Sequence, residues 1–338
     1  MGDCHFVIPT TSSTAISQVP RCSSARARVA AGLTRVALRP VTDVLPMNRA
    51  GLWFSRRLVA TSMSLLGPVV EGTATTQVDE GPVRGEWVCA PGVERGGRVI
   101  LYLHGSAYVI CSARTHRGLA SSLSKATGLA VFTVDYRLAP EHAFPAAADD
   151  IESAYRWLLA AGHAAEDIVV AGDSAGGHLA VDLLIENDRS RMPQPGAMVL
   201  FSPLIDLRFE LASAQERGRK DPMISAAAAR KMVEMYTGDH PADLPRLRLQ
   251  LPRIDRLPPT LIQVGGAEML VADARYLHNM IRQSGGSSTL EIWPDQMHVF
   301  QALPRLVPEA RHALRRAATF AAQQREHRDE AVRERRKA

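Results

Sequence analysis

Short apolar runs alternate along the chain with longer stretches of helical periodicity. The apolar runs lie at Val99–Leu103, Ala130–Val134, Ile168–Ala171, Met198–Phe201 and Leu261–Val264, with Leu290–Trp293 as an interrupted sixth, and the helical stretches lie near 115–126, 146–161, 175–187, 272–284 and 308–323. Strands that are apolar at every position are buried on both faces, which is typical of parallel sheets flanked by helices. The pattern therefore predicts an α/β fold with a mainly parallel central sheet covered by helices on both faces.

Two stretches depart from this alternation. In Met47–Leu66, apolar residues recur at helical spacing with charge on the opposite side, which predicts an amphipathic helix. Residues 207–256 are rich in charge and interrupt the order of strands and helices. Insertions at the carboxyl edge of such a sheet commonly cover a ligand site. We expect the stretches 47–80 and 207–245 to form a helical lid.

The two ends of the chain lack the patterning of the middle. Residues 1–46 are rich in Ser, Thr, Ala and Arg and have no sustained period, so we expect them to be disordered or to precede the true start of the protein. Residues 325–338 are mostly charged and predict a solvated tail. The predicted folded domain therefore spans residues 47–324.

The excess of positive charge lies at these ends. The 338-residue chain has a formal net charge of +5, of which residues 1–46 contribute +3 and residues 325–338 contribute +2. Because the body between them is formally neutral, the charge argues against a nucleic-acid partner. Contact with a membrane surface through the helix at 47–66 and the basic ends stays an open alternative.

Cysteine usage and hydropathy indicate the compartment. The four cysteines are far apart and form no metal-binding pattern with histidines, which predicts free thiols, a reducing compartment and no metal. No apolar stretch approaches the length of a membrane span, and the N-terminus does not read as a secretory signal. We expect a cytoplasmic protein, and the sequence leaves its oligomeric state open.

The segment Gly172–Gly176 reads Gly-Asp-Ser-Ala-Gly and lies between an apolar strand and a helical stretch. A serine hydroxyl needs an exposed position within reach of a base to act as a nucleophile. A sharp strand-to-helix turn flanked by glycines provides that position. Ser174 is therefore the candidate nucleophile.

A second turn, His104–Tyr108, follows the strand at 99–103. Acyl transfer develops a negative oxygen, which backbone N–H groups in a tight loop of small residues can stabilise. Gly105, Ser106 and Ala107 are the candidate donors in this loop, together with Ala175 after the nucleophile.

The candidate base is His298, because it follows the nucleophile in chain order and lies in a loop directly after a strand. Two carboxylates follow the preceding strand and could orient it. Glu268 comes directly off that strand, whereas Asp273 begins the next helix and could cap it. We favour Glu268 and keep Asp273 as the alternative.

With these residues in place, the chain resembles the hormone-sensitive-lipase-like family of α/β-hydrolases over about residues 98–323. The most specific piece is Asp135–Ala147, which closely matches a stretch diagnostic of that family and structural within it. The family's His-Gly-Gly-Gly loop corresponds to residues 104–107, its Gly-Asp-Ser-Ala-Gly elbow to 172–176 and its Asp-His-x-Phe end to 296–300.

The resemblance implies an α/β-hydrolase fold with a helical lid and a catalytic triad of Ser174, Glu268 and His298. Two departures stand out: Ser106 replaces the middle glycine of the loop, and Glu268-Met269-Leu270 replaces the usual Asp-Pro-Leu. The serine keeps an N–H but adds a side chain, which we expect either to narrow the acyl pocket or to restrict esters of tertiary alcohols. Glutamate is a known substitute for the acid in this fold.

The expected function is hydrolysis of small-molecule carboxylic esters with short to medium acyl chains, without metal or organic cofactor. An amidase or other acyl hydrolase on the same scaffold is the alternative among enzymes. A ligand-binding relative that has lost catalysis is the alternative from another class, although such proteins typically lack the base that His298 supplies.

Overall fold

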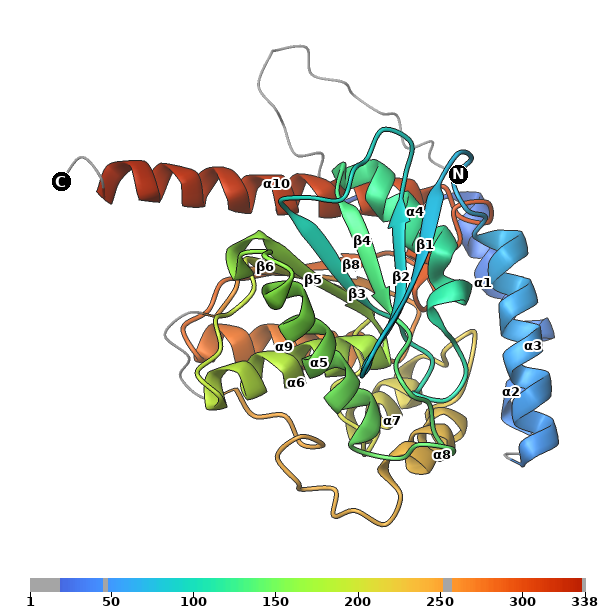
Figure 1. Cartoon of the computed structure of the whole chain (residues 1–338). Coiled ribbons are helices and arrows are strands. Elements are labelled where there is room, and N and C mark those ends of the chain that lie inside the picture. Colours follow the sequence, from blue (N-terminus) through green and yellow to red (C-terminus); the bar gives the residue numbers. More distant parts are fainter. Residues whose placement is uncertain (1–18, 45–47, 252–256, 336–338) are drawn as a thin grey trace.

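The structure is a computed structural model that describes residues 19–44, 48–251 and 257–335 (Figure 1). Within these residues one eight-stranded sheet has the order β1-β2-β4-β3-β5-β6-β7-β8. The strands are β1 (Ala74–Glu80), β2 (Val83–Cys89), β3 (Val99–Leu103), β4 (Ala130–Val134), β5 (Ile168–Asp173), β6 (Ala197–Phe201), β7 (Thr260–Gly265) and β8 (Ser288–Trp293). Only β2 runs against its neighbours, pairing antiparallel with β1 and β4.

Ten α-helices surround the sheet in the described part of the chain. They are α1 (Ala25–Ala37), α2 (Arg39–Val44), α3 (Arg49–Leu66), α4 (Ala113–Thr127), α5 (Ala146–Ala160), α6 (Ala175–Arg189), α7 (Glu210–Gly218), α8 (Ala226–Thr237), α9 (Val271–Gln283) and α10 (Glu309–Arg335). No helix among the described residues combines the length and the apolarity needed to cross a bilayer.

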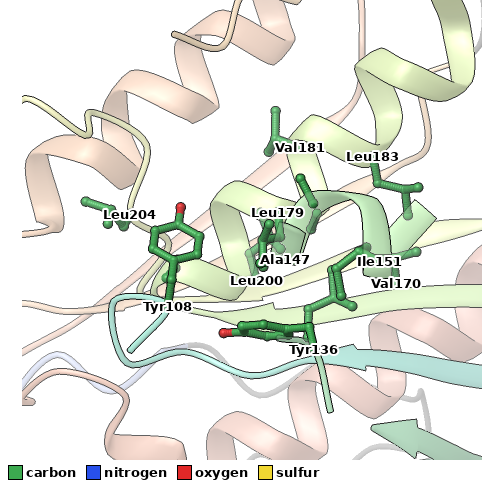
Figure 2. Packing of buried hydrophobic residues seen from close by; sticks show 14 of the residues in the cluster. Tyr108, Tyr136, Ala147, Ile151, Val170, Leu179, Val181, Leu183, Leu200 and Leu204 are labelled. Atoms are coloured by element: carbon green, nitrogen blue, oxygen red, sulfur yellow. The ribbon is translucent and has the colours of Figure 1, made fainter. Parts of the chain in front are cut away.

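The central strands are buried on both faces, as their unbroken apolar runs predicted. On β3, Leu101 and Leu103 pack into one core with residues of α5, α6 and α9. Ile100 and Tyr102, which alternate with them, pack into a second core with residues of α4 and α10. Figure 2 shows part of the first core, in which Leu179 and Leu183 of α6 lie over the sheet. The predicted mainly parallel sheet, covered on both faces, is confirmed.

Residues 19–44 differ from the predicted disorder, because they form α1 and α2. Ala27 and Ala30 on α1 are buried in a small core with Trp293. The backbone N–H of Ser24 donates to the Glu309 carboxylate at 2.7 Å. For these residues the prediction is wrong, since contacts with the far end of the chain stabilise a segment whose own pattern is weak. Residues 1–18 lie outside the described residues.

The other predicted boundaries shift as well. Residues 74–80 of the expected lid form the edge strand β1 instead. Helix α10 continues through the predicted charged tail as far as Arg335. Helix α3 occupies the stretch predicted to be an amphipathic helix, and α7 and α8 lie within the insertion at 207–245.

Candidate active site

Ser174 lies at the turn between β5 and α6. Its φ of 51° and ψ of −119° fall outside the regions that residues with a side chain ordinarily occupy. Its backbone N–H donates to the Phe201 carbonyl at 3.0 Å, which ties the turn to β6. The packing is close, because a Cβ on Gly176 would lie 1.9 Å from the Leu103 carbonyl oxygen. This is the sharp, strained strand-to-helix turn expected for the nucleophile of this fold.

The loop after β3 passes directly against this turn. A Cβ on Gly105 would lie 2.9 Å from the Cβ of Ser174, so only glycine fits there. Ser106 and Ala107 both have positive φ, at 77° and 54°. The Gly105 N–H already donates to the Asp173 carboxylate at 3.1 Å. Gly105 was predicted as an oxyanion donor, but its N–H already has this partner within the protein, so it is not among the donors proposed below.

The buried Glu268 pairs with the half-buried His298. His298 Nδ1 and the Glu268 Oε2 are 2.5 Å apart. The other oxygen of Glu268 accepts from the Ser202 hydroxyl and the Gly265 N–H, both at 2.6 Å. Burial of the His298 ring opposes its charge, but the neighbouring Glu268 carboxylate outweighs burial and raises the pKa of His298 above its ordinary value. The carboxylate thus orients the ring and favours its protonated form.

Asp273, the alternative acid, has different partners. One of its oxygens accepts the backbone N–H groups of Ile205 and Asp206, at 2.9 and 2.8 Å. Burial raises the pKa of this carboxyl to about 7. Asp273 therefore holds the loop that follows β6, and the structure brings Glu268, not Asp273, to the histidine.

Ser174 and His298 line one cavity of about 240 Å³. Ser106 and Ala107 lie at the same cavity, and most of the other lining side chains are apolar. They come from the end of α1 and from α2 (Leu38, Thr42), from α3 (Leu58, Val59, Met63), and from the insertion and α8 (Phe209, Ile224, Met232). The cavity is thus closed by the N-terminal helices and the insertion together. Within the described residues, no group of His, Cys, Asp or Glu side chains is placed to hold a metal ion.

Comparisons with known proteins identify the family. Residues 100–302 match a family model described as the alpha/beta hydrolase fold. The chain is 34% identical over 318 residues to the carboxylesterase/phospholipase LipF of Mycobacterium tuberculosis. This alignment covers 88% of the chain and 81% of LipF. It is 39% identical over 246 residues to an acetyl-hydrolase of Streptomyces hygroscopicus, with 72% and 81% covered. A crystal structure of an esterase from the bacterial hormone-sensitive lipase family matches with a TM-score of 0.81 at 35% identity, covering 90% and 99%. The chain belongs to the hormone-sensitive-lipase-like family of α/β-hydrolases.

The Asp135–Ala147 segment, on which the resemblance mainly rested, packs against the loop after β3 in this hydrolase. The Tyr136 hydroxyl donates to the His104 carbonyl at 2.8 Å, and the two rings stack at 4.1 Å. Burial lowers the pKa of His104 to about 3, so this ring is neutral. Arg137 donates from Nη2 to Asp150 at 2.7 Å, which ties the segment to α5. The interpretation of the segment as structural fits these contacts.

One arginine joins helix α3 to this segment. Arg56 on α3 donates to the Val109 carbonyl at 2.9 Å and to the Ala139 carbonyl at 3.2 Å. It also pairs with Glu141 at 2.9 Å. Helix α3 is therefore fixed both to the loop after β3 and to the Asp135–Ala147 segment of the hydrolase.

Sequence reasoning missed a buried ion pair beside the nucleophile. Asp173 accepts from the Tyr102 hydroxyl at 2.7 Å and lies 3.4 Å from His116 Nε2. Burial opposes the charge of His116, but Asp173 outweighs it and raises the pKa of His116 to about 10. The position of Asp173 next to Ser174 was visible in the sequence. Nothing in the sequence pointed to His116 as its partner, because the two residues are 57 positions apart and belong to different elements.

A second missed carboxylate, Asp221, holds the insertion of the hydrolase against the acid loop. Its oxygens accept the backbone N–H of Met269 at 2.9 Å and that of Met223 at 2.7 Å. Burial raises the pKa of Asp221 to about 6. The Asp-Pro pair at 221–222 marked a turn, but its contact with the residue after Glu268 had no signal in the sequence.

Proposed function

We propose that the chain is a serine carboxylic-ester hydrolase in which Ser174, His298 and Glu268 form the catalytic triad. The observation that carries the proposal is the short contact between His298 Nδ1 and the buried Glu268, because His298 lines the same cavity as Ser174. The names of its relatives, which include a carboxylesterase/phospholipase and an acetyl-hydrolase, support the reaction class.

In the proposed mechanism His298 takes the proton of the Ser174 hydroxyl as its oxygen attacks the ester carbonyl carbon. The Glu268 carboxylate stabilises the imidazolium that forms. His298 then gives the proton to the departing alkoxide, and the acyl group stays on Ser174. A water molecule, deprotonated by His298, attacks the acyl-enzyme, and the carboxylic acid leaves as Ser174 regains its proton.

Backbone N–H groups of Ser106, Ala107 and Ala175 are the proposed donors to the negative oxygen. The positive φ values of Ser106 and Ala107 support this assignment, because such a bend turns successive N–H groups toward one point. Ala175 is the residue after the nucleophile, which supplies a donor in this fold.

The proposed substrates are esters with short to medium acyl chains. The cavity of about 240 Å³ supports this preference, since it is smaller than the roughly 300–1,000 Å³ typical of pockets for drug-sized ligands. Its apolar lining suits an acyl chain better than a polar substituent. The amidase alternative shares this geometry and differs in its leaving group.

The test is hydrolysis of p-nitrophenyl esters of increasing acyl length, with the matching p-nitroanilides as the control for amidase activity. We expect ester turnover that is highest for short or medium chains and falls for long ones. Ser174→Ala should lower this turnover by several orders of magnitude without changing the melting temperature. Retention of about a tenth of the rate by the folded variant would contradict the proposed nucleophile.

A further inference from the structure

Exposed large apolar side chains of the described residues gather in one part of the chain. Seven of eight lie between residues 29 and 69, and Tyr276 is the exception. Val29, Leu33 and Val36 belong to α1, and Trp53, Phe54 and Leu65 belong to α3. Val36 is 77% exposed and Trp53 is 63% exposed. Single exposed apolar residues need no explanation, but a concentration of this kind marks an interaction surface.

The helices order these side chains into stripes. On α1, Val29, Leu33 and Val36 have the spacing of one helix face, and the buried Ala27 and Ala30 lie on another. On α3, the exposed positions 49, 50, 53, 54, 57, 61, 64 and 65 fall within an arc of about 160°. The residues of α3 that line the cavity, 55, 58, 59 and 63, lie on the other side. Figure 1 shows both helices on the same side of the molecule.

The charge of residues 19–69 is almost entirely positive. Residues 19–69 contain eight arginines and one acidic residue, Asp43. Only part of this charge is compensated from elsewhere: Arg39 pairs with Glu216 and Arg56 with Glu141. The guanidinium of Arg57 lies 5.5 Å from the centre of the exposed Trp53 ring. Arginine beside aromatic and aliphatic side chains on a helix face is the combination that suits the interface of an anionic bilayer.

We propose that the outer faces of α1 and α3 form a docking surface for an anionic lipid bilayer. Exposed apolar side chains would enter the interface, and arginines would contact the acidic headgroups. Because the inner face of α3 lines the cavity, a bilayer on its outer face would lie one helix away from Ser174. The proposal concerns this surface alone and does not depend on hydrolysis by the site.

The test is co-sedimentation of the full chain, carrying Ser174→Ala so that no lipid is consumed, with phosphatidylcholine vesicles that contain or lack about one third phosphatidylglycerol. We expect binding to the anionic vesicles that weakens as salt is raised. Trp53→Ser/Phe54→Ser should weaken it about tenfold or more, while Tyr276→Ser, at the exposed apolar position elsewhere, leaves it unchanged. Arg26→Gln/Arg57→Gln should weaken it by about five-fold per arginine.

A second readout locates the contact. Brominated lipids should quench the tryptophan fluorescence of the bound protein, and Trp53→Phe should remove most of that quenching. Of the other three tryptophans, Trp87 and Trp293 are buried, and Trp157 on α5 is partly buried against Trp87. Absence of binding to anionic vesicles would overturn the proposal, as would binding that both double variants retain. A vesicle-free dimer that Trp53→Ser/Phe54→Ser dissociates would assign the surface to a second copy of the chain and would equally overturn it.

Discussion

At the scale of single residues, the structure separates carboxylates that look alike in the sequence. Glu268 and Asp273 are five positions apart and both are buried, yet only Glu268 contacts His298. Asp273 instead accepts two backbone N–H groups. A carboxylate that orients a base and one that holds a loop contribute differently to turnover, so substitutions distinguish the two roles.

Glu268→Gln should lower ester turnover by about three to four orders of magnitude, because an amide loses the counter-charge of the imidazolium and disturbs the tautomer of His298. Asp273→Asn should stay within about tenfold of the parent, since its amide oxygen still accepts the N–H groups of Ile205 and Asp206. The measurement is kcat for p-nitrophenyl butyrate with both folded variants. The reverse ranking would assign the acid to Asp273.

The Asp173–His116 pair makes stability depend on pH. The pKa of His116 is raised from 6.5 to about 10 by Asp173, so folding binds a proton there. Its stabilisation is complete below the unfolded pKa and is lost as pH rises through the folded pKa. His116→Gln should therefore lower the melting temperature most near pH 6 and progressively less toward pH 10. Thermal melts of parent and variant across this range measure it, and a difference that is constant with pH would refute it.

At the scale of elements, α1 and α2 belong to the folded enzyme. Leu38 and Thr42 line the cavity, and Arg39 of α2 pairs with Glu216 of α7 at 3.0 Å. Ser24, the N-cap of α1, donates its backbone N–H to Glu309 at the start of α10. These helices therefore connect the insertion at 207–245 to the start of α10.

Removal of residues 1–46 should lower the melting temperature by about 4 °C or more, because it removes two hydrogen-bonded contacts to charged groups and uncovers a buried core. It should also lower kcat/KM for short-chain esters, since part of the cavity wall is lost. Removal of residues 1–18 alone is the matched control, because it keeps every contact described for α1 and α2. Equal melting temperatures for the two truncated proteins would show that α1 and α2 add no stability.

At the scale of the whole molecule, the sequence predicted those features that depend on residues close together in the chain. Ser174 and His298 each follow a strand within a few residues, so the alternation of strands and helices was enough to find them. Helix α1 was missed because its stability comes from contacts such as Ser24 with Glu309, which are 285 positions apart. The Asp173–His116 pair was missed for the same reason. The hydrogen bond from the Gly105 N–H to Asp173 also had no signal in the sequence, because it depends on where one carboxylate oxygen lies.

The cavity gathers residues from Leu38 to Leu303, so activity should require almost the whole chain. Ribosome-bound chains arrested before Glu309 has emerged should not hydrolyse a fluorogenic short-chain ester. Chains extended by a C-terminal linker, which expose all 338 residues while still attached, should be active. Activity in the shorter arrested chains would show that the cavity forms without the start of α10.

The hydrogen bond between Ser24 and Glu309 also means that α1 cannot reach its native contacts until late in synthesis. Helices α1 and α2 leave the ribosome long before their partner on α10 exists. At roughly 5–20 residues per second, the 265 positions between Val44 and Glu309 take about 15–50 s to synthesise. Throughout that interval Ala27 and Ala30 lack the part of their native core that α10 supplies, and the apolar side chains of Val29 and Leu33 are exposed beside them. The newborn chain is therefore exposed to aggregation at its beginning, and a chaperone that shields its first 44 residues would improve the yield of folded enzyme most.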